Sequence, residues 1–140
     1  MTLHVKNISI SINSPKDTVY QFAANPENFS KWLAFLKSVS KISENVWNAE
    51  TNLGKIEIEL TPKNQFGIID HVVKLPDGNI ITNPLRVIEN KSGSEIIFTL
   101  FKMPGKTDIE FEDDAKMVNA DLKKLKELLE MREQRTANRL

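Results

Sequence analysis

The stretch that decides the fold is residues 107–136, TDIEFEDDAKMVNADLKKLKELLEMREQRT. Its apolar residues follow one another in steps of four and three, the spacing that places side chains on one face of an α-helix. The stripe consists of Phe111, Ala115, Val118, Leu122, Leu125 and Leu129. A helix of this length is about 45 Å long at about 1.5 Å per residue. The stripe therefore predicts an extensive partner surface.

Two signals mark the start of this helix. Thr107 is a good capping residue, and Glu110, three positions later, can reach back to the cap. Pro104 and Gly105 terminate the structural element that precedes the helix. Because the heptad spacing is too short for a coiled coil, we predict a core helix. The alternative is a helix whose exposed part binds a partner.

The rest of the chain predicts a sheet for this helix. Residues Val5–Ile12 alternate as a half-buried strand does. Ser14 with Pro15, and Asn25 with Pro26, each begin a short helix, with Ser14 as the cap of the first. Between residues 38 and 103, turn signals separate six strands in meander order. This order predicts an α+β fold in which a seven-stranded curved antiparallel sheet wraps around the long C-terminal helix, with two short helices between strands 1 and 2.

Composition limits the classes of function. The chain has 140 residues, with 19 basic and 19 acidic side chains, two histidines and no cysteine. The length predicts one domain, residues 1–140, and the balanced charge argues against a nucleic-acid partner. We expect no cofactor and no metal, since the histidines lie far apart and no glycine-rich phosphate loop occurs. No signal peptide or membrane span is recognisable, which predicts a cytoplasmic protein without membrane insertion.

Four stretches resemble a known family. They are SPKDTVYQFAANPENFSKW (14–32), FGIIDH (66–71), PLRVI (84–88) and DLKKLKELL (121–129). With them the chain resembles the SRPBCC superfamily of START-like and Bet v 1-like helix-grip proteins, in its polyketide cyclase/dehydrase-like branch. The resemblance implies a hollow between the sheet and the long helix. Since the family includes carriers, cyclases, hydrolases and receptors, it implies a fold more than a function.

Turn signals give a strand register, and the register decides which side chains face the hollow. Asp77-Gly78 predicts a two-residue hairpin turn with Pro76 opposite Asn79. In this register the polar residues that point into the concave side are His71, Thr82 and Arg86. Those that point out are Glu57, Asp70, Lys74 and Glu89.

A four-residue loop at 62–65 extends the register to the preceding strand. It pairs Ile58 with Ile69, and it also places Glu57 opposite Asp70, a like-charge pair that argues against the register. A slip of one residue would exchange the two faces of the sheet.

Arg86 and His71 each have two explanations. On an apolar face, Arg86 needs an acceptor, which is either an anionic or carbonyl-bearing ligand or a carboxylate at the rim. His71 is either a general acid or base, because its ordinary pKa is near 6.5, or a hydrogen-bonded core histidine.

The candidate ligand-binding residues are those predicted to surround the hollow. They are Trp32, Phe35, Ile58, Ile69, His71, Thr82, Arg86, Phe111, Ala115 and Val118. Along the helix, Ala115 leaves room between two larger neighbours. Further on, Leu122, Leu125 and Leu129 are predicted to close the other end of the hollow.

Three functions fit this pattern. The first is binding of a small hydrophobic or aromatic ligand, polyketide-like or lipid-like, in the cavity. The second is a cyclase or dehydratase in which His71 transfers protons and Arg86 stabilises enolate charge. The third is an interaction module without a ligand, and the protein is expected to be a monomer or a homodimer. The single inward histidine and the lack of paired carboxylates favour binding.

Overall fold

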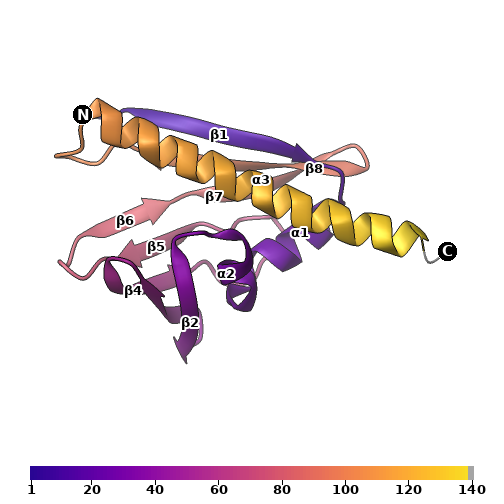
Figure 1. Cartoon of the computed structure of the whole chain (residues 1–140), viewed down its shortest axis with the longest axis horizontal. Coiled ribbons are helices and arrows are strands. Elements are labelled where there is room, and N and C mark those ends of the chain that lie inside the picture. The colour runs from indigo at the N-terminus through magenta and orange to yellow at the C-terminus, as the bar shows by residue number, and fades with distance from the viewer. Residues whose placement is uncertain (139–140) are drawn as a thin grey trace.

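The computed structural model describes the backbone of residues 1–138 and the side chains of residues 1–135. Figure 1 shows the long helix α3 (Asp108–Asn138) lying along the strands β1 (Val5–Ile12) and β8 (Gly93–Phe101). Between β1 and β2 lie α1 (Lys16–Ala23), the 3-10 turn η1 (Pro26–Asn28) and α2 (Phe29–Trp32). The remaining strands are β2 (Leu36–Ser43), β3 (Val46–Thr51), β4 (Gly54–Leu60), β5 (His71–Lys74), β6 (Ile80–Asn83) and β7 (Leu85–Asn90). No helix in the described part of the chain is long and apolar enough to cross a membrane.

The strands form two antiparallel sheets, in the orders β1-β8-β7 and β2-β3-β4-β5-β6. The predicted α+β fold, with its long C-terminal helix against antiparallel strands and two short helices after the first strand, is confirmed. The strand count differs, because the described residues form eight strands where the sequence predicts seven. The extra one arises where the stretch before Asn90 is divided into β6 and β7 at Pro84.

Pro84 divides this strand because it has no N–H to donate to a sheet ladder. Its carbonyl still accepts from the Thr99 N–H at 3.0 Å. Beyond it, β7 turns to pair with β8, while β6 pairs with β5. Segment 67–69 bonds across the same corner, since Ile69 N–H donates to Leu85 O at 2.7 Å and Val87 N–H to Gly67 O at 2.9 Å. The two sheets therefore meet at one sharply bent corner.

Helix α3 begins with the predicted capping box. The Thr107 N–H donates to Glu110 Oε1 at 3.0 Å, and the Glu110 N–H donates to Thr107 Oγ1 at 3.1 Å. The prediction for Ser14 is wrong, because α1 is capped at Pro15 and no side chain bonds its first turn. Instead the buried Ser14 hydroxyl donates to Glu133 of α3 at 3.2 Å, which joins the start of α1 to the far part of the long helix.

The buried apolar residues form two clusters. The first surrounds the C-terminal half of α3, where Leu122, Leu125 and Leu129 are at most 1% exposed. Its other buried members are Ile12, Val19, Tyr20, Ala23, Trp32, Ile69, Leu85, Val87 and Ile96. The second cluster lies on the inner face of the five-stranded sheet and contains Phe29, Leu36, Ala49, Ile56 and Ile58. The three leucines thus close one end of the molecule, as predicted.

Gly67 allows a close backbone approach at the sheet corner. Its φ is +74°, and a Cβ at this position would lie 2.2 Å from the Val87 carbonyl oxygen. Gly78, in the β5–β6 turn, also has a positive φ, but a Cβ there would meet nothing within 4 Å.

We expect Gly67→Ala to lower the free energy of unfolding clearly more than Gly78→Ala. The left-handed backbone costs an alanine about 1–2 kcal/mol at either site, and only Gly67→Ala adds a steric clash. Urea unfolding of the two variants measures the difference. Equal losses would show that the corner is not as tightly packed as described.

Candidate functional site

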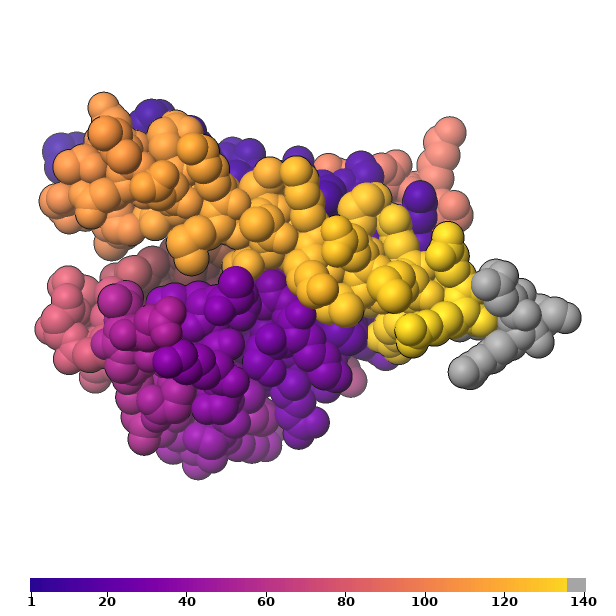
Figure 2. Space-filling model, in the orientation of Figure 1, coloured from indigo at the N-terminus to yellow at the C-terminus, as the bar shows by residue number. Residues whose placement is uncertain are grey.

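Figure 2 shows that the surface is hollowed between the first part of α3, drawn in orange, and the β5–β6 hairpin, drawn in pink. Along its length α3 packs on β1, and it also contacts β8 and α2. The inner face of the five-stranded sheet carries the second apolar cluster. The hollow is the space between the N-terminal half of α3 and that inner face.

Half-buried apolar side chains lie on the elements that border this hollow. Val118 of α3 and Phe98 of β8 are half-buried and pack against the first cluster. Val73 and Leu75 from β5 and the adjoining turn are half-buried against the second. Leu33 packs against both clusters and links them. Sequence reasoning missed Leu33, Val73 and Leu75 as candidates, because nothing local distinguishes them from other core positions.

The predicted register of the β5–β6 hairpin is wrong by one residue. The turn closes with the Leu75 N–H donating to Asn79 O at 2.9 Å, and β5 pairs Val73 with Ile81 and Val72 with Thr82. Pro76 explains the shift, since it has no N–H with which to close a two-residue turn opposite Asn79. The Asp77 carboxylate accepts the Asn79 N–H at 2.9 Å and stabilises the longer turn.

Thr82 consequently does not face the hollow. Its partner Val72 lies next to Glu59 on the outer face, and the Thr82 side chain is exposed. The loop before β5 is also longer than predicted, so Ile58 pairs with Val73 and not with Ile69. Glu57 then lies opposite Lys74, an oppositely charged residue. The predicted register would have paired Glu57 with Asp70, and this like-charge pair does not occur.

Arg86 also points away from the hollow, which corrects its predicted orientation. It lies on the outer face, where its Nη2 is 2.9 Å from Asp70 Oδ2 and its Nε is 3.3 Å from Asp70 Oδ1. Asp70 also accepts the Leu85 N–H at 2.9 Å. Partial burial raises the pKa of the Asp70 carboxyl, but the hydrogen bonds from Arg86 and from the Leu85 N–H outweigh it and lower that pKa. Two acceptors were considered for Arg86, a ligand and a carboxylate. In the structure the acceptor is the carboxylate of Asp70.

His71 does face inward, as predicted, opposite Leu60. Its Nδ1 lies 3.0 Å from Ile69 O, and its Nε2 lies 3.4 Å from Asn83 Nδ2. A carbonyl accepts only from a protonated nitrogen, so Nδ1 carries the proton and Nε2 accepts from Asn83. Burial lowers the pKa of His71, with smaller opposing effects from the Ile69 carbonyl and Asp70. This is the geometry of a neutral, hydrogen-bonded core histidine.

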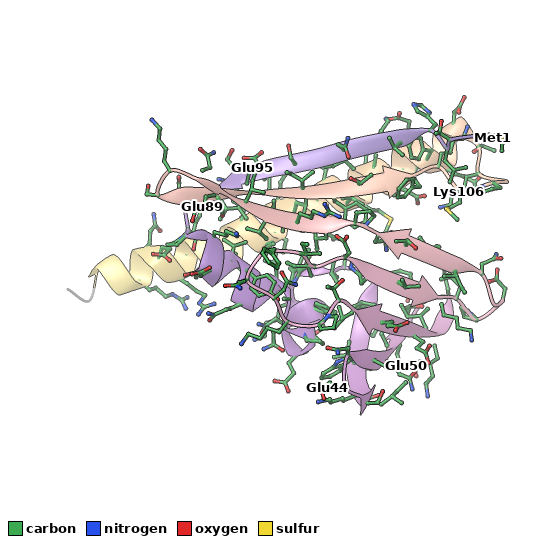
Figure 3. The ribbon with its side chains drawn as sticks, turned by 180° about the vertical axis from the view of Figure 1, so that it is seen from behind. Met1, Glu44, Glu50, Glu89, Glu95 and Lys106 are labelled. Carbon is green, nitrogen blue, oxygen red and sulfur yellow. The ribbon has the colours of Figure 1, made fainter. Side chains whose placement is uncertain are left out.

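The remaining candidates divide between the hollow and the core. Ala115 and Val118 are half-buried on α3. Phe111 is only 2% exposed. Its ring centroid is 5.3 Å from that of His4, just before β1, and 5.5 Å from the Nζ of Lys6 in β1. The prediction that Phe111 borders the hollow is therefore wrong, because β1 covers this side of the helix. The sequence predicts that Glu89 points out. In the structure its side chain is on the same side of β7 as the buried Val87, but it is exposed at the end of the strand beside α1. Figure 3 labels Glu89 at this end of the β7–β8 hairpin.

Trp32, Phe35, Ile58 and Ile69 are all buried or half-buried, but in different clusters. Trp32 and Ile69 belong to the first cluster, whereas Ile58 belongs to the second and Phe35 packs against it. Within the described residues, the Trp32 Nε1–H is buried and has no hydrogen-bond partner. Leaving such a donor unpaired costs about 1–3 kcal/mol.

No protein-family model and no curated protein matches this sequence. Solved structures do match its fold. XoxI from Bacillus cereus has a TM-score of 0.73 at 15% identity, and the alignment covers 92% of this chain and 96% of XoxI. For Ara h 8.0201, a protein of the Bet v 1 family, the TM-score is 0.68 at 11% identity, with 91% and 97% covered. The chain has the helix-grip fold.

A third similar structure is DynU16, from the dynemicin biosynthetic locus. Its TM-score is 0.72 at 14% identity, and the alignment covers 90% of this chain but 47% of DynU16. These similarities agree with the SRPBCC resemblance of the sequence at the level of the fold. Helix-grip geometry accounts for the arrangement of α3 beside a curved sheet, with the hollow between them.

The lowered pKa of His71 predicts a pH dependence of stability. In the folded protein the pKa lies below its ordinary value of 6.5, so protonation favours the unfolded chain. The contribution is complete above pH 6.5 and is lost as the pH falls from 6.5 through the folded-state pKa. We expect the free energy of unfolding to decrease between pH 7.5 and 5.5, and His71→Gln to flatten this decrease.

His4→Gln is the matched control, because it removes the other histidine, which is exposed. Urea unfolding at several pH values measures the slope for each variant. An unchanged slope in His71→Gln, or an equal change in His4→Gln, would contradict the assignment.

Proposed function

We propose that this protein binds a small hydrophobic or aromatic molecule, polyketide-like or lipid-like, in the hollow between α3 and the five-stranded sheet. The observation that carries the proposal is the hollow between the first part of α3 and the five-stranded sheet, whose inner face carries the second apolar cluster. A bound apolar molecule would cover the apolar inner face of the sheet on this side. Each Å² of apolar surface that it removes from water contributes about 25 cal/mol.

The residues around the hollow have the character of a ligand site. Such sites are concave and mainly apolar, with few polar groups to orient the ligand. Val73, Leu75, Phe98 and Val118 supply half-buried apolar surface. The similar proteins support the same class of function, since Ara h 8.0201 belongs to the Bet v 1 family and DynU16 comes from a biosynthetic locus.

The positions of His71 and Arg86 favour binding over a cyclase or dehydratase. The catalytic alternative needs both side chains at one cavity. His71 faces inward from β5 of the five-stranded sheet, whereas Arg86 lies on the outer face of β7 in the three-stranded sheet. Both ring nitrogens of His71 are already within hydrogen-bond reach of protein groups, and Arg86 is paired with Asp70. This pair therefore does not supply the proton transfer and charge stabilisation on which the enzyme hypothesis was based.

Ala115→Trp tests the location of the site. A large side chain at this half-buried position of α3 should fill the hollow and weaken binding of the neutral fluorescent probe N-phenyl-1-naphthylamine by about tenfold or more, since a loss of 1.4 kcal/mol is already tenfold. Fluorescence titration measures the affinity. Lys116→Trp is the matched control, because it adds the same side chain at the exposed neighbouring position and should leave binding unchanged.

Arg86→Gln should also leave the affinity unchanged, since Arg86 lies on the outer face. If Ala115→Trp binds the probe as the natural chain does, the site lies elsewhere. If neither this probe nor any aromatic or lipid compound raises the melting temperature in a thermal-shift screen, the proposal fails, and the ligand-free interaction module is the better explanation.

A further inference from the structure

A second concave surface lies where α1 and η1 meet the five-stranded sheet. It is a groove of about 470 Å³ between these two elements and the ends of β2, β3 and β4. Figure 3 labels Glu44, which lines the groove at the end of the β2–β3 hairpin. None of the residues assigned to the hollow lines this groove. Small-molecule sites commonly measure about 300–1,000 Å³, so the groove has room for one.

Trp47 and Leu60 give the groove an apolar part. Trp47 lies two residues before the buried Ala49 on β3, and Leu60 lies two residues after the buried Ile58 on β4. Because alternate residues of a strand share a face, both side chains are on the inner face of the sheet. Trp47 is half-buried, so part of its indole ring is accessible from the groove. A flat aromatic molecule can pack against this ring.

Two exposed lysines also line the groove. Lys41 is directly opposite Trp47 in the β2–β3 ladder, and Lys63 lies in the loop after β4. In the part of the chain that the structure describes, neither ammonium group forms a hydrogen bond or an ion pair. Glu44 is the carboxylate of the lining, which therefore has two positive charges against one negative charge. This balance favours an anion.

The Tyr20 hydroxyl adds a donor on the Lys63 side of the groove. The residue lines the groove, is only 7% exposed, and its Oη accepts the Asn64 N–H at 2.9 Å. That bond uses a lone pair of the oxygen, and among the described residues no acceptor takes the hydroxyl proton. Since Asn64 follows Lys63 in the chain, the bond holds the hydroxyl beside the loop that carries this lysine. Both groups can donate to one carboxylate.

We propose that this groove is a second binding site, which takes a flat aromatic carboxylate. The ring of the ligand packs on Trp47, and its carboxylate is bound by the two lysines and the Tyr20 hydroxyl. The site is separate from the hollow, so this inference does not rest on the proposed function. An uncharged molecule of the same shape lacks the charged contacts and binds more weakly.

A matched pair of compounds tests the charge preference. 2-Naphthoate and 2-naphthamide have the same frame and differ in charge. We expect Lys63→Gln and Lys41→Gln each to weaken 2-naphthoate by about fivefold, the upper end for an exposed ion pair, and to leave 2-naphthamide unchanged. Calorimetric titration at physiological ionic strength, where charges more than about 8 Å apart are largely screened, measures both affinities.

Lys55→Gln is the matched control for charge. Lys55 is an exposed lysine on the outer face of the same sheet, opposite Glu50, and its loss should leave the affinity for 2-naphthoate unchanged. An equal loss in Lys55→Gln would show a general effect of net charge and overturn the inference. Unchanged affinity in both groove variants would overturn it as well.

The indole N–H signals test the location. The chain has two tryptophans, Trp32 and Trp47. In ¹⁵N-labelled protein, 2-naphthoate should shift the Trp47 signal and leave that of the buried Trp32 in place, with Trp47→Phe to assign the two signals. No change of the Trp47 signal at millimolar 2-naphthoate would overturn the second site.

Competition with N-phenyl-1-naphthylamine separates this inference from the proposed function. If the two sites are distinct, this neutral probe does not displace 2-naphthoate. Displacement without a response of Trp47 would place the carboxylate in the hollow, which overturns the second site but supports the proposed function. A Trp47 response in a protein that does not bind the neutral probe would support the second site alone.

Discussion

The structure depends on the way in which α3 is held at one end. Leu122, Leu125 and Leu129 are almost completely buried among residues of α1, β1 and β8, and each buried leucine contributes about 1.5–3 kcal/mol. The first half of the helix is held by β1 instead, where Lys6 lies over the Phe111 ring and forms an ion pair with Glu112. The first half of the helix has its contacts on the β1 side, and the five-stranded sheet faces it across a hollow.

At the corner where the two sheets meet, the side chains of two successive residues, Asp70 and His71, form hydrogen bonds with the backbone and not with a substrate. At Pro84 the ladder is interrupted, and the side chains of Asp70 and His71 bond the backbone groups nearby. Asp70 accepts the Leu85 N–H, and His71 donates to the Ile69 carbonyl. In the sequence, His71 is a candidate general acid or base, and Asp70 is predicted only to point out. Their polar atoms instead replace hydrogen bonds that a continuous strand would make with its neighbour.

The sequence predicts the periodic features of this fold well and the registers poorly. The helix stripe and its capping box follow from spacing alone, and both are present. The inward side of His71 was predicted from the turn-based register, and it holds although that register is shifted, because the shift between β4 and β5 is an even number of residues. The hairpin register fails at Pro76 and the strand count fails at Pro84, although both follow from a missing proline N–H that the sequence displays. The pairing of Arg86 with Asp70 depends on that register, and the unpaired Trp32 donor depends on three-dimensional packing, so neither was predictable.

The capping box at Thr107 has a consequence for dynamics. The turns of α3 beside the hollow expose Ile109 and Met117, and they bury less apolar surface than the leucine end. Local opening takes the least free energy where the least surface is buried, so amide hydrogen exchange is fastest there. The cap keeps these turns helical between openings. Transient fraying of this helix end therefore widens the hollow, while the leucine end keeps the protein folded.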